Sequence, residues 1–245
     1  MDKKLLLSKS LAIFLRNYLQ SINDIVRRYP HAAVQIKHDG SPVTELDLFL
    51  SSHIETIFTD HFPDITFYSE ENFSAWKFPL LALDPLDGTK EYIEGRNEWA
   101  ISIGLFADEV FDGEGWVYNP KTEELFDHSL PAFPFQEKPS YRGEVSRSEW
   151  EKKLFRPSYQ EKFKIHPVGS IAYKLGRLAS QKCDFVVSLR PKNIWDIAGG
   201  TLLCQKAGLK FYSQGKEVTH VSQLYQPPLI WCHEELYSSL SKFFP

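Results

Sequence analysis

Near the start of the chain, apolar residues recur at the spacing of amphipathic helices. In the first segment they stand three or four positions apart, at Leu7, Leu11, Phe14, Tyr18, Ile22 and Ile25. They share one face of a predicted helix, which Tyr29-Pro30 would end. A second helix is predicted to begin near Thr44 and to run through Phe58. Such stripes indicate packing against a core rather than a binding site.

The pattern then changes to the period of β-strands. Two apolar runs of strand length, residues 65–68 and 80–83, are each followed by acidic residues, Glu70-Glu71 and Asp84. A short helix is expected after Gly88. Alternating positions predict an antiparallel meander over residues 99–106, 115–118 and 124–126.

The last part of the chain alternates helices and strands. Residues 131–157 contain several prolines and little periodicity, which predicts an irregular junction. Beyond the junction, helices are predicted over residues 170–180, 195–207 and 234–243, and strands over residues 185–189, 209–212 and 229–232. Elements that alternate in this way indicate a layered α/β architecture.

The composition is that of a globular protein and excludes several other classes. Of the 245 residues, 42% are hydrophobic and 24% are charged, which excludes a disordered chain and a small disulfide scaffold. The 32 acidic and 28 basic residues give a net charge of −4 with the histidines neutral. A non-specific nucleic-acid-binding protein would usually be basic, so we expect no nucleic-acid partner.

The cysteines and the N-terminus favour a cytoplasmic protein. Cys183, Cys204 and Cys232 form no close pair and no metal-type spacing, as in reduced intracellular proteins. Lys9 and Arg16 interrupt the apolar N-terminal runs, and no signal-peptide cleavage site follows. No apolar run approaches the about 18 residues of a membrane span, so we expect no membrane partner.

The most informative segment for chemistry is Asp84-Pro85-Leu86-Asp87-Gly88-Thr89. Pro85 disfavours helix at Asp84, so the chain is expected to turn there. Asp87 then falls at the cap of the next helix, beside the backbone N–H groups of Gly88 and Thr89. Two close carboxylates repel each other unless a cation lies between them, and Mg²⁺ prefers such oxygen ligands. In the alternative interpretation, Asp87 is only a helix cap and Asp84 only a turn residue.

Three further acidic residues have both a chemical and a structural interpretation. Glu70 follows a strand, and if its strand and the next end together, it lies near Asp84. Asp196 stands at the predicted start of a helix, where it would also interact favourably with the helix dipole. Asp47 follows Thr44 by three positions, which is the spacing of a capping box, and for Asp47 alone this structural role is favoured.

Together these residues resemble the inositol monophosphatase superfamily of lithium-sensitive, Mg²⁺-dependent phosphatases. The resemblance covers about residues 37 to 215, and the motifs that carry it are Val43-Thr44-x-x-Asp47, Glu70-Glu71, Asp84–Thr89 and Trp195–Gly199. The resemblance implies a layered αβαβα sandwich. It also implies a single phosphatase unit over residues 1–245, with a metal-binding α+β half (1–140) and an α/β half (141–245). Members of this superfamily are often homodimers.

Within the superfamily, the chain is most similar to the bacterial 3′(2′),5′-bisphosphate nucleotidase branch. Inositol monophosphatases usually carry a substrate-contacting glutamate seven residues before the Trp-Asp aspartate, and here that position is Leu189. The implied substrate is a small phosphorylated metabolite, foremost 3′-phosphoadenosine 5′-phosphate. An inositol or other polyol monophosphatase is the alternative enzyme, and a regulatory protein that retains the fold is the non-enzymatic alternative.

The resemblance also implies roles for individual residues. One Mg²⁺ would bind Glu70, Asp84 and the carbonyl of Leu86, and a second would bind Asp84, Asp87 and Asp196, with two or three ions in all. The attacking water would be activated by the metals and oriented by Thr89 and Asp47, with Glu70 also at the reacting centre.

Other groups of the chain would hold the substrate. The backbone N–H groups of Gly88 and Thr89 would hold the phosphate. Ser170 and Lys192 are the candidates for contacts to the rest of the substrate, although helix capping explains Ser170 equally well.

Overall fold

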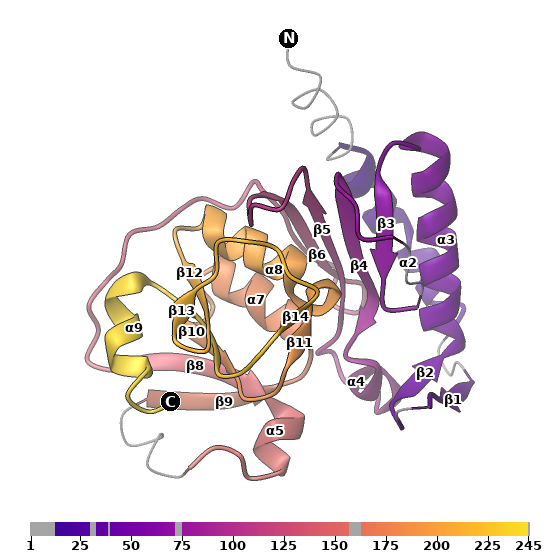
Figure 1. The fold of residues 1–245 in the computed structure, drawn as a ribbon. Helices are drawn as coiled ribbons and strands as arrows, with labels where there is room; N and C mark the ends of the chain where they lie inside the picture. The colour runs from indigo at the N-terminus through magenta and orange to yellow at the C-terminus, as the bar shows by residue number, and fades with distance from the viewer. Residues whose placement is uncertain (1–12, 30–32, 39, 72–74, 157–162, 245) are drawn as a thin grey trace.

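The computed structural model describes residues 13–29, 33–38, 40–71, 75–156 and 163–244. Two sheets dominate the fold (Figure 1). The first has five strands in the order β3 (Thr66–Ser69), β4 (Leu80–Asp87), β5 (Ala100–Phe106), β6 (Gly113–Asn119) and β7 (Glu124–Phe126). The second has six strands in the order β13 (Lys216–Glu217), β12 (Lys210–Ser213), β15 (Leu229–Cys232), β10 (Phe185–Ser188), β8 (Tyr141–Ser146) and β9 (Phe163–Val168).

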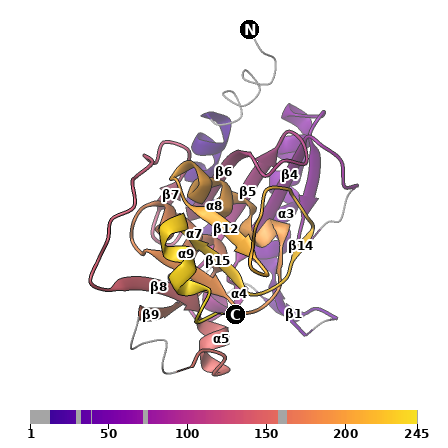
Figure 2. The same ribbon diagram turned by 60° about the vertical axis from the view of Figure 1, so that its left-hand side comes forward.

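Helices form three layers around and between these sheets. A helix over residues 13–21 and helices α2 (Asn23–Val26) and α3 (Glu45–His61) lie on the outer side of the five-stranded sheet. Between the sheets lie α7 (Ile171–Ala179) and α8 (Ile194–Lys206). Helix α9 (Glu234–Leu240) covers the outer side of the six-stranded sheet, and Figure 2, in which α9 comes forward, shows the five-stranded sheet behind it. The predicted αβαβα sandwich is therefore confirmed.

Small elements complete the chain. They are the hairpin of β1 (Val34–Ile36) with β2 (Pro42–Thr44), the pair of β11 (Lys192–Asn193) with β14 (Leu224–Tyr225), and the short helices α4 (Thr89–Ile93) and α5 (Arg147–Glu151). Among the described residues, none of the helices has both the length and the apolar character that crossing a bilayer requires.

The core consists of three apolar clusters that match the layers. The largest joins the inner faces of both sheets to α7 and α8. A second packs α3 and the N-terminal helix onto the five-stranded sheet, and a third packs α9 onto the six-stranded sheet. Helix α8 approaches its sheet very closely, since a Cβ on Gly199 would lie 2.5 Å from the carbonyl oxygen of Trp116. This close packing brings the start of α8 to the end of β4.

The prediction of an irregular junction over residues 131–157 was wrong in part, because β8 and α5 lie within it. Strand β8 lies between β9 and β10 and is parallel to both, yet its buried positions are Gly143, Glu144 and Val145. Gly143 leaves room for the ring of Phe185, and Glu144 pairs with Arg177. A central strand that buries a glycine and a glutamate has no apolar alternation to detect.

Candidate active site

The first feature of the site is the proximity of Glu70 and Asp84. Strands β3 and β4 are parallel, with Ser69 opposite Leu83, and the amide of Glu70 donates to the carbonyl of Leu83 at 3.3 Å. The expectation that these two acids end neighbouring strands is therefore met. Asp84 is only 2% exposed, and burial raises its pKa well above the usual range, with the charges of Glu70, Asp87 and Asp196 adding to the effect.

The predicted turn at Asp84 is an irregularity within β4. The strand continues to Asp87, with a register shift against β5 between these two residues. Oδ1 of Asp84 accepts a hydrogen bond from the amide of Leu86 at 2.9 Å, and this contact accommodates Pro85 inside the strand. The irregular step leaves both aspartates near the start of α4.

Asp87 does not cap α4, which corrects the structural alternative considered for it. Gly88 stands at that cap, with a φ of 98° that suits glycine. Asp87 instead accepts two hydrogen bonds from the start of α7 through Oδ2. The hydroxyl of Ser170 and the amide of Ala172 each donate to this oxygen at 2.6 Å. Asp87 is thereby linked to two residues that lie 83 and 85 positions further along the chain.

Asp47 makes the capping contacts that the sequence predicted and also contacts Thr89. It belongs to a capping box with Thr44, whose amide donates to Oδ2 of Asp47 at 2.8 Å. Its other oxygen, Oδ1, accepts from the hydroxyl of Thr89 at 3.1 Å. That hydroxyl also lies 3.2 Å from the carbonyl oxygen of Leu86. The capping box therefore holds a carboxylate at a fixed distance from the start of α4.

Asp196 stands in the first turn of α8 and accepts from the amide of Asn193 at 2.9 Å. Its pKa is raised to about 7, chiefly by burial, with the charge of Lys192 opposing the shift and the charges of Asp87 and Glu70 adding to it. The four predicted acidic ligands thus lie within electrostatic range of one another. The half-buried Lys192 lies within range of Asp196 as well.

Lys37 supplies positive charge beside Glu70. Its ammonium lies 2.7 Å from Oε1 of Glu70 and 2.6 Å from Oε1 of Glu71. Burial alone would lower the pKa of Lys37, but these two hydrogen bonds raise it above its usual range. Glu70 and Glu71 are therefore both paired with the ammonium of Lys37.

The donor set has the chemistry of a hard divalent cation site, since it offers carboxylates and a backbone carbonyl. In the part of the chain that the structure describes, no three acidic, histidine or cysteine side chains converge tightly enough to form a metal site by themselves. A bound cation would have to draw the carboxylates together. The raised pKa values of Asp84 and Asp196 show that positive charge between them would be favourable.

The two predicted substrate-binding residues lie beside the acids. The hydroxyl of Ser170 accepts from the amide of Tyr173 at 3.0 Å, so Ser170 is the cap of α7 as well as a donor to Asp87. Lys192 begins β11, just before Asp196. Binding of substrate by Ser170 and Lys192 stays a prediction.

A set of charged residues around the turn at residues 167–170 was missed in the sequence. Glu98 accepts from the amide of Gly169 at 2.7 Å and pairs with Arg147 at 2.5 Å. Lys174 is 1% exposed and donates to the carbonyls of this turn. A lysine inside a helix gives no signal of burial in a sequence.

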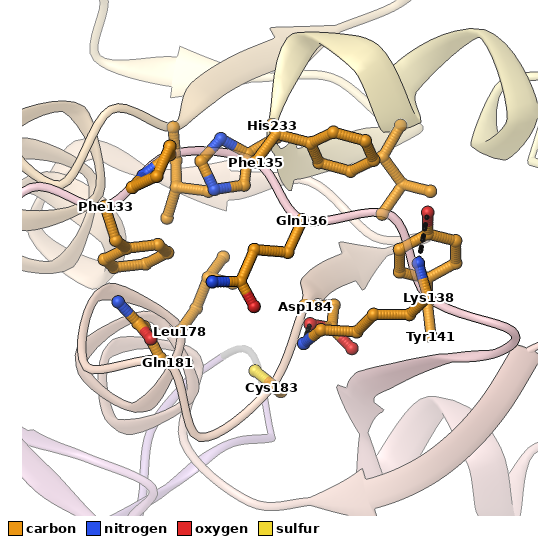
Figure 3. Close-up of a pocket in the computed structure, with 13 residues that line it drawn as sticks. Phe133, Phe135, Gln136, Lys138, Tyr141, Leu178, Gln181, Cys183, Asp184 and His233 are labelled. Carbon is orange, nitrogen blue, oxygen red and sulfur yellow. Dashed lines mark hydrogen bonds and ion pairs between the residues drawn. The ribbon is translucent and has the colours of Figure 1, made fainter.

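A cavity lies away from this site, at the other end of α7 (Figure 3). The side chains of Gln136 and Cys183 lie in it, below the ring of His233, and Lys138 pairs with Asp184 on one side. None of the predicted site residues lines it.

Comparisons with known proteins agree with the geometry. A model described as the inositol monophosphatase family matches residues 9–235. The 3′(2′),5′-bisphosphate nucleotidase CysQ of Salmonella typhimurium is 27% identical over 207 residues, which are 75% of this chain and 81% of that protein. Inositol monophosphatase 3 of Solanum lycopersicum is 28% identical over 213 residues, which are 76% and 79%.

A solved structure described as an IMPase/NADP phosphatase complexed with Mg²⁺ and phosphate shares the fold. Its TM-score to this chain is 0.80 at 16% sequence identity, covering 96% of this chain and 95% of that chain.

Proposed function

The chain belongs to the inositol monophosphatase family and is a hydrolase of phosphomonoesters, and from this premise we propose that it is a divalent-metal-dependent 3′(2′),5′-bisphosphate nucleotidase. The proposed reaction is the attack of water on the 3′-phosphate of 3′-phosphoadenosine 5′-phosphate, which gives AMP and phosphate.

The proposed metal ligands are the acids at the ends of β3 and β4 and at the start of α8. One Mg²⁺ would be held by Glu70, Asp84 and the carbonyl of Leu86, and another by Asp84, Asp87 and Asp196. The total would be two or three ions. The Mg²⁺ in the solved IMPase/NADP phosphatase of the same fold supports a site of this kind. Such ions polarise phosphoryl oxygens and acidify a water at neutral pH.

The observation that carries the catalytic proposal is the hydrogen bond from Thr89 to Asp47. Because the hydroxyl proton points to Oδ1 of Asp47, the lone pairs of the Thr89 oxygen can accept a hydrogen bond from the attacking water. As the Thr89 oxygen takes up the proton of the water, the hydroxyl proton would pass to the carboxylate of Asp47, which is buried and held by Thr44, so that no charge builds up on the hydroxyl. Glu70 would help to orient the same water.

Other groups of the chain would bind the substrate. The backbone N–H groups of Gly88 and Thr89 would donate to the phosphate oxygens. Ser170 and Lys192 would contact the remainder of the nucleotide, with Lys192 placed to attract the second phosphate.

Position 189 favours a nucleotide over inositol. The amide of Leu189 donates to Oε2 of Glu149 at 2.7 Å, and its half-buried side chain packs on the apolar cluster under α9. Leu189 offers no carboxylate to the hydroxyls of a polyol ring. The CysQ similarity supports the same choice, although the plant inositol monophosphatase is similar to the same extent.

A substrate panel tests the proposal. With Mg²⁺ present, kcat/KM should be higher for 3′-phosphoadenosine 5′-phosphate than for inositol 1-phosphate, and chelation should abolish both activities. The opposite ranking would assign the chain to the polyol monophosphatases. No phosphate release from any substrate of the panel would favour a regulatory protein that retains the fold.

We also propose that residues 1–140 and 141–245 act as the two halves of one catalytic unit. Lithium inhibition and a homodimer stay predictions from the family resemblance, and a cytoplasmic location stays a prediction from the cysteines and the N-terminal residues.

A further inference from the structure

The turn that precedes α7 is held from inside by one buried lysine. The ammonium of Lys174 donates to three consecutive carbonyl oxygens, of Val168 at 3.0 Å, Gly169 at 3.1 Å and Ser170 at 2.8 Å. An ammonium has three N–H donors, and all three are used here. Within the described part of the chain, no carboxylate accepts a hydrogen bond from Lys174, so its ammonium is directed at the backbone of this turn.

The turn needs such support because its backbone is unusual. Ser170 has a φ of 48°, which a residue with a side chain rarely adopts. Gly169 lies so close to Glu91 that a Cβ there would be 2.3 Å from Cγ of Glu91. A conformation of this kind persists only where its surroundings enforce it. Three carbonyls gathered on one ammonium provide that enforcement.

The turn holds the carboxylate of Asp87 in place. Ser170 and Ala172 both donate to Oδ2 of Asp87, one through its hydroxyl and the other through its amide. The direction of both donors depends on the backbone conformation that the hydrogen bonds of Lys174 stabilise. Lys174 itself makes no hydrogen bond to Asp87, so its influence passes through the turn.

Keeping a charge at this place costs free energy. Burial lowers the pKa of Lys174 to about 8, even though the charge of Asp87 opposes the shift. An apolar residue of similar length would fill the space without that cost. The buried charge of Lys174 is therefore explained by its orientation of the three carbonyls rather than by the stability of the fold alone.

We propose that Lys174 is a positioning residue of the active site, which holds the turn at residues 168–170 so that Ser170 and Ala172 keep Asp87 oriented toward a divalent cation. This role rests on the proposed function, because the orientation of Asp87 matters for catalysis only if Asp87 binds the metal.

The test compares Lys174→Met with a matched control on the same helix, Arg177→Lys. Methionine keeps the length of Lys174 and loses the three donors. Arg177 lies three residues further along α7 and pairs with Glu144 of β8, away from the turn. Lysine at position 177 keeps the charge and loses the two-point contact, so this control weakens the fold without touching the turn.

Two readouts are needed, one of them independent of activity. For Lys174→Met we expect the Mg²⁺ concentration at half-maximal phosphate release to rise at least about tenfold, a change of about 1.4 kcal/mol, with saturating Mg²⁺ restoring much of kcat. In the metal-free protein, the Ala172 amide should exchange its hydrogen at least tenfold faster than in the wild type. Arg177→Lys should leave both values unchanged while lowering Tm.

The outcomes separate this proposal from the proposed function. An active wild type together with unchanged Mg²⁺ dependence and unchanged Ala172 exchange in Lys174→Met would overturn the positioning role alone. A wild type that neither binds Mg²⁺ in calorimetry nor releases phosphate would overturn the proposed function. Should Lys174→Met not fold, Lys174→Gln, which keeps two donors on a shorter neutral side chain, decides the question by the same two readouts.

Discussion

The hydroxyl of Thr89 donates a hydrogen bond to Oδ1 of Asp47 at 3.1 Å, across 42 positions of sequence. This contact joins the first turn of α3 to the first residue of α4. The same Asp47 accepts from the amide of Thr44 through its other oxygen, so it is held from two sides. A helix cap thereby becomes the support of a hydroxyl that we propose to be catalytic.

Thr89→Ala tests that role. The substitution removes the hydroxyl and leaves the capping box of Asp47 with Thr44 intact, so the fold should be retained. We expect kcat to fall by about 100-fold or more, the typical contribution of a positioned proton acceptor, with KM changed only a few-fold. Steady-state kinetics at saturating Mg²⁺ measure both constants.

The matched control is Thr122→Ala, which removes an exposed hydroxyl bonded to Glu124. Its kinetic constants should equal those of the wild type. A Thr89→Ala enzyme that keeps more than a tenth of wild-type kcat would exclude the proposed role of the hydroxyl.

The site could be predicted from the sequence where neighbouring strands determine it. Glu70 and Asp84 each follow an apolar run, and parallel pairing of those runs was enough to bring them together. The partner of Asp87 could not be predicted in this way, because it is the start of α7, more than eighty positions away. Long-range contacts between a loop and a helix leave no periodic pattern.

The fold shows the same division. Most helices and strands with apolar periodicity lie close to their predicted ranges. Strand β8 was missed because Gly143 and Glu144 occupy its buried positions, and β9 was missed although its buried positions alternate. The inward orientation of Lys174 was missed for a related reason. A lysine is usually exposed, and only the folded chain shows which ones point inward.

The acids of the site should make the stability of the metal-free protein fall as the pH rises. The pKa of Asp196 is about 7 in the folded chain against 3.8 as its ordinary value, and that of Asp84 is raised as well. Protonated Asp196 stabilises the folded state below a pH of about 4, and this contribution is lost as the pH rises to about 7, while Asp84 acts in the same direction. Urea unfolding in EDTA from pH 4 to pH 7.5 should therefore show a falling midpoint.

Bound Mg²⁺ should reverse that trend, because it favours the ionised carboxylates. Repeating the series with Mg²⁺ should give the larger stabilisation at the higher pH. If the midpoint of the metal-free protein instead rises over this interval, the electrostatic description of the site is wrong.

Lys37 should compete with the metal for Glu70. Its ammonium lies 2.7 Å from Oε1 of Glu70, so a cation that binds the same carboxylate is repelled by the charge of Lys37. We expect Lys37→Met to lower the Tm of the metal-free protein and to increase the rise in Tm that Mg²⁺ produces. Lys90→Met is the control, since Lys90 is exposed and pairs with Glu151 and Glu94. Equal Mg²⁺ shifts in the wild type and Lys37→Met would argue against competition.

Glu144 should be required for stability and not for metal binding. It is fully buried in β8, and its carboxylate accepts hydrogen bonds from both Nε and Nη2 of Arg177. Glu144→Gln leaves that half-buried arginine without its counter-charge and should lower the free energy of unfolding by about 3 kcal/mol. The urea midpoint measures the loss, while the Mg²⁺ dependence of turnover should stay at the wild-type value. A loss below about 1 kcal/mol, as for an exposed pair, would contradict this assignment.

The most direct test of the account is Mg²⁺-dependent phosphate release by Asp84→Asn, measured beside the wild type. Asp84 is the proposed ligand of both metals, and the neutral amide also removes its repulsion of Glu70, Asp87 and Asp196. We predict a folded variant, with a metal-free Tm at or above that of the wild type, that binds Mg²⁺ poorly and releases no phosphate above background. Substantial Mg²⁺-dependent turnover by folded Asp84→Asn would contradict the assignment of these carboxylates as the metal site.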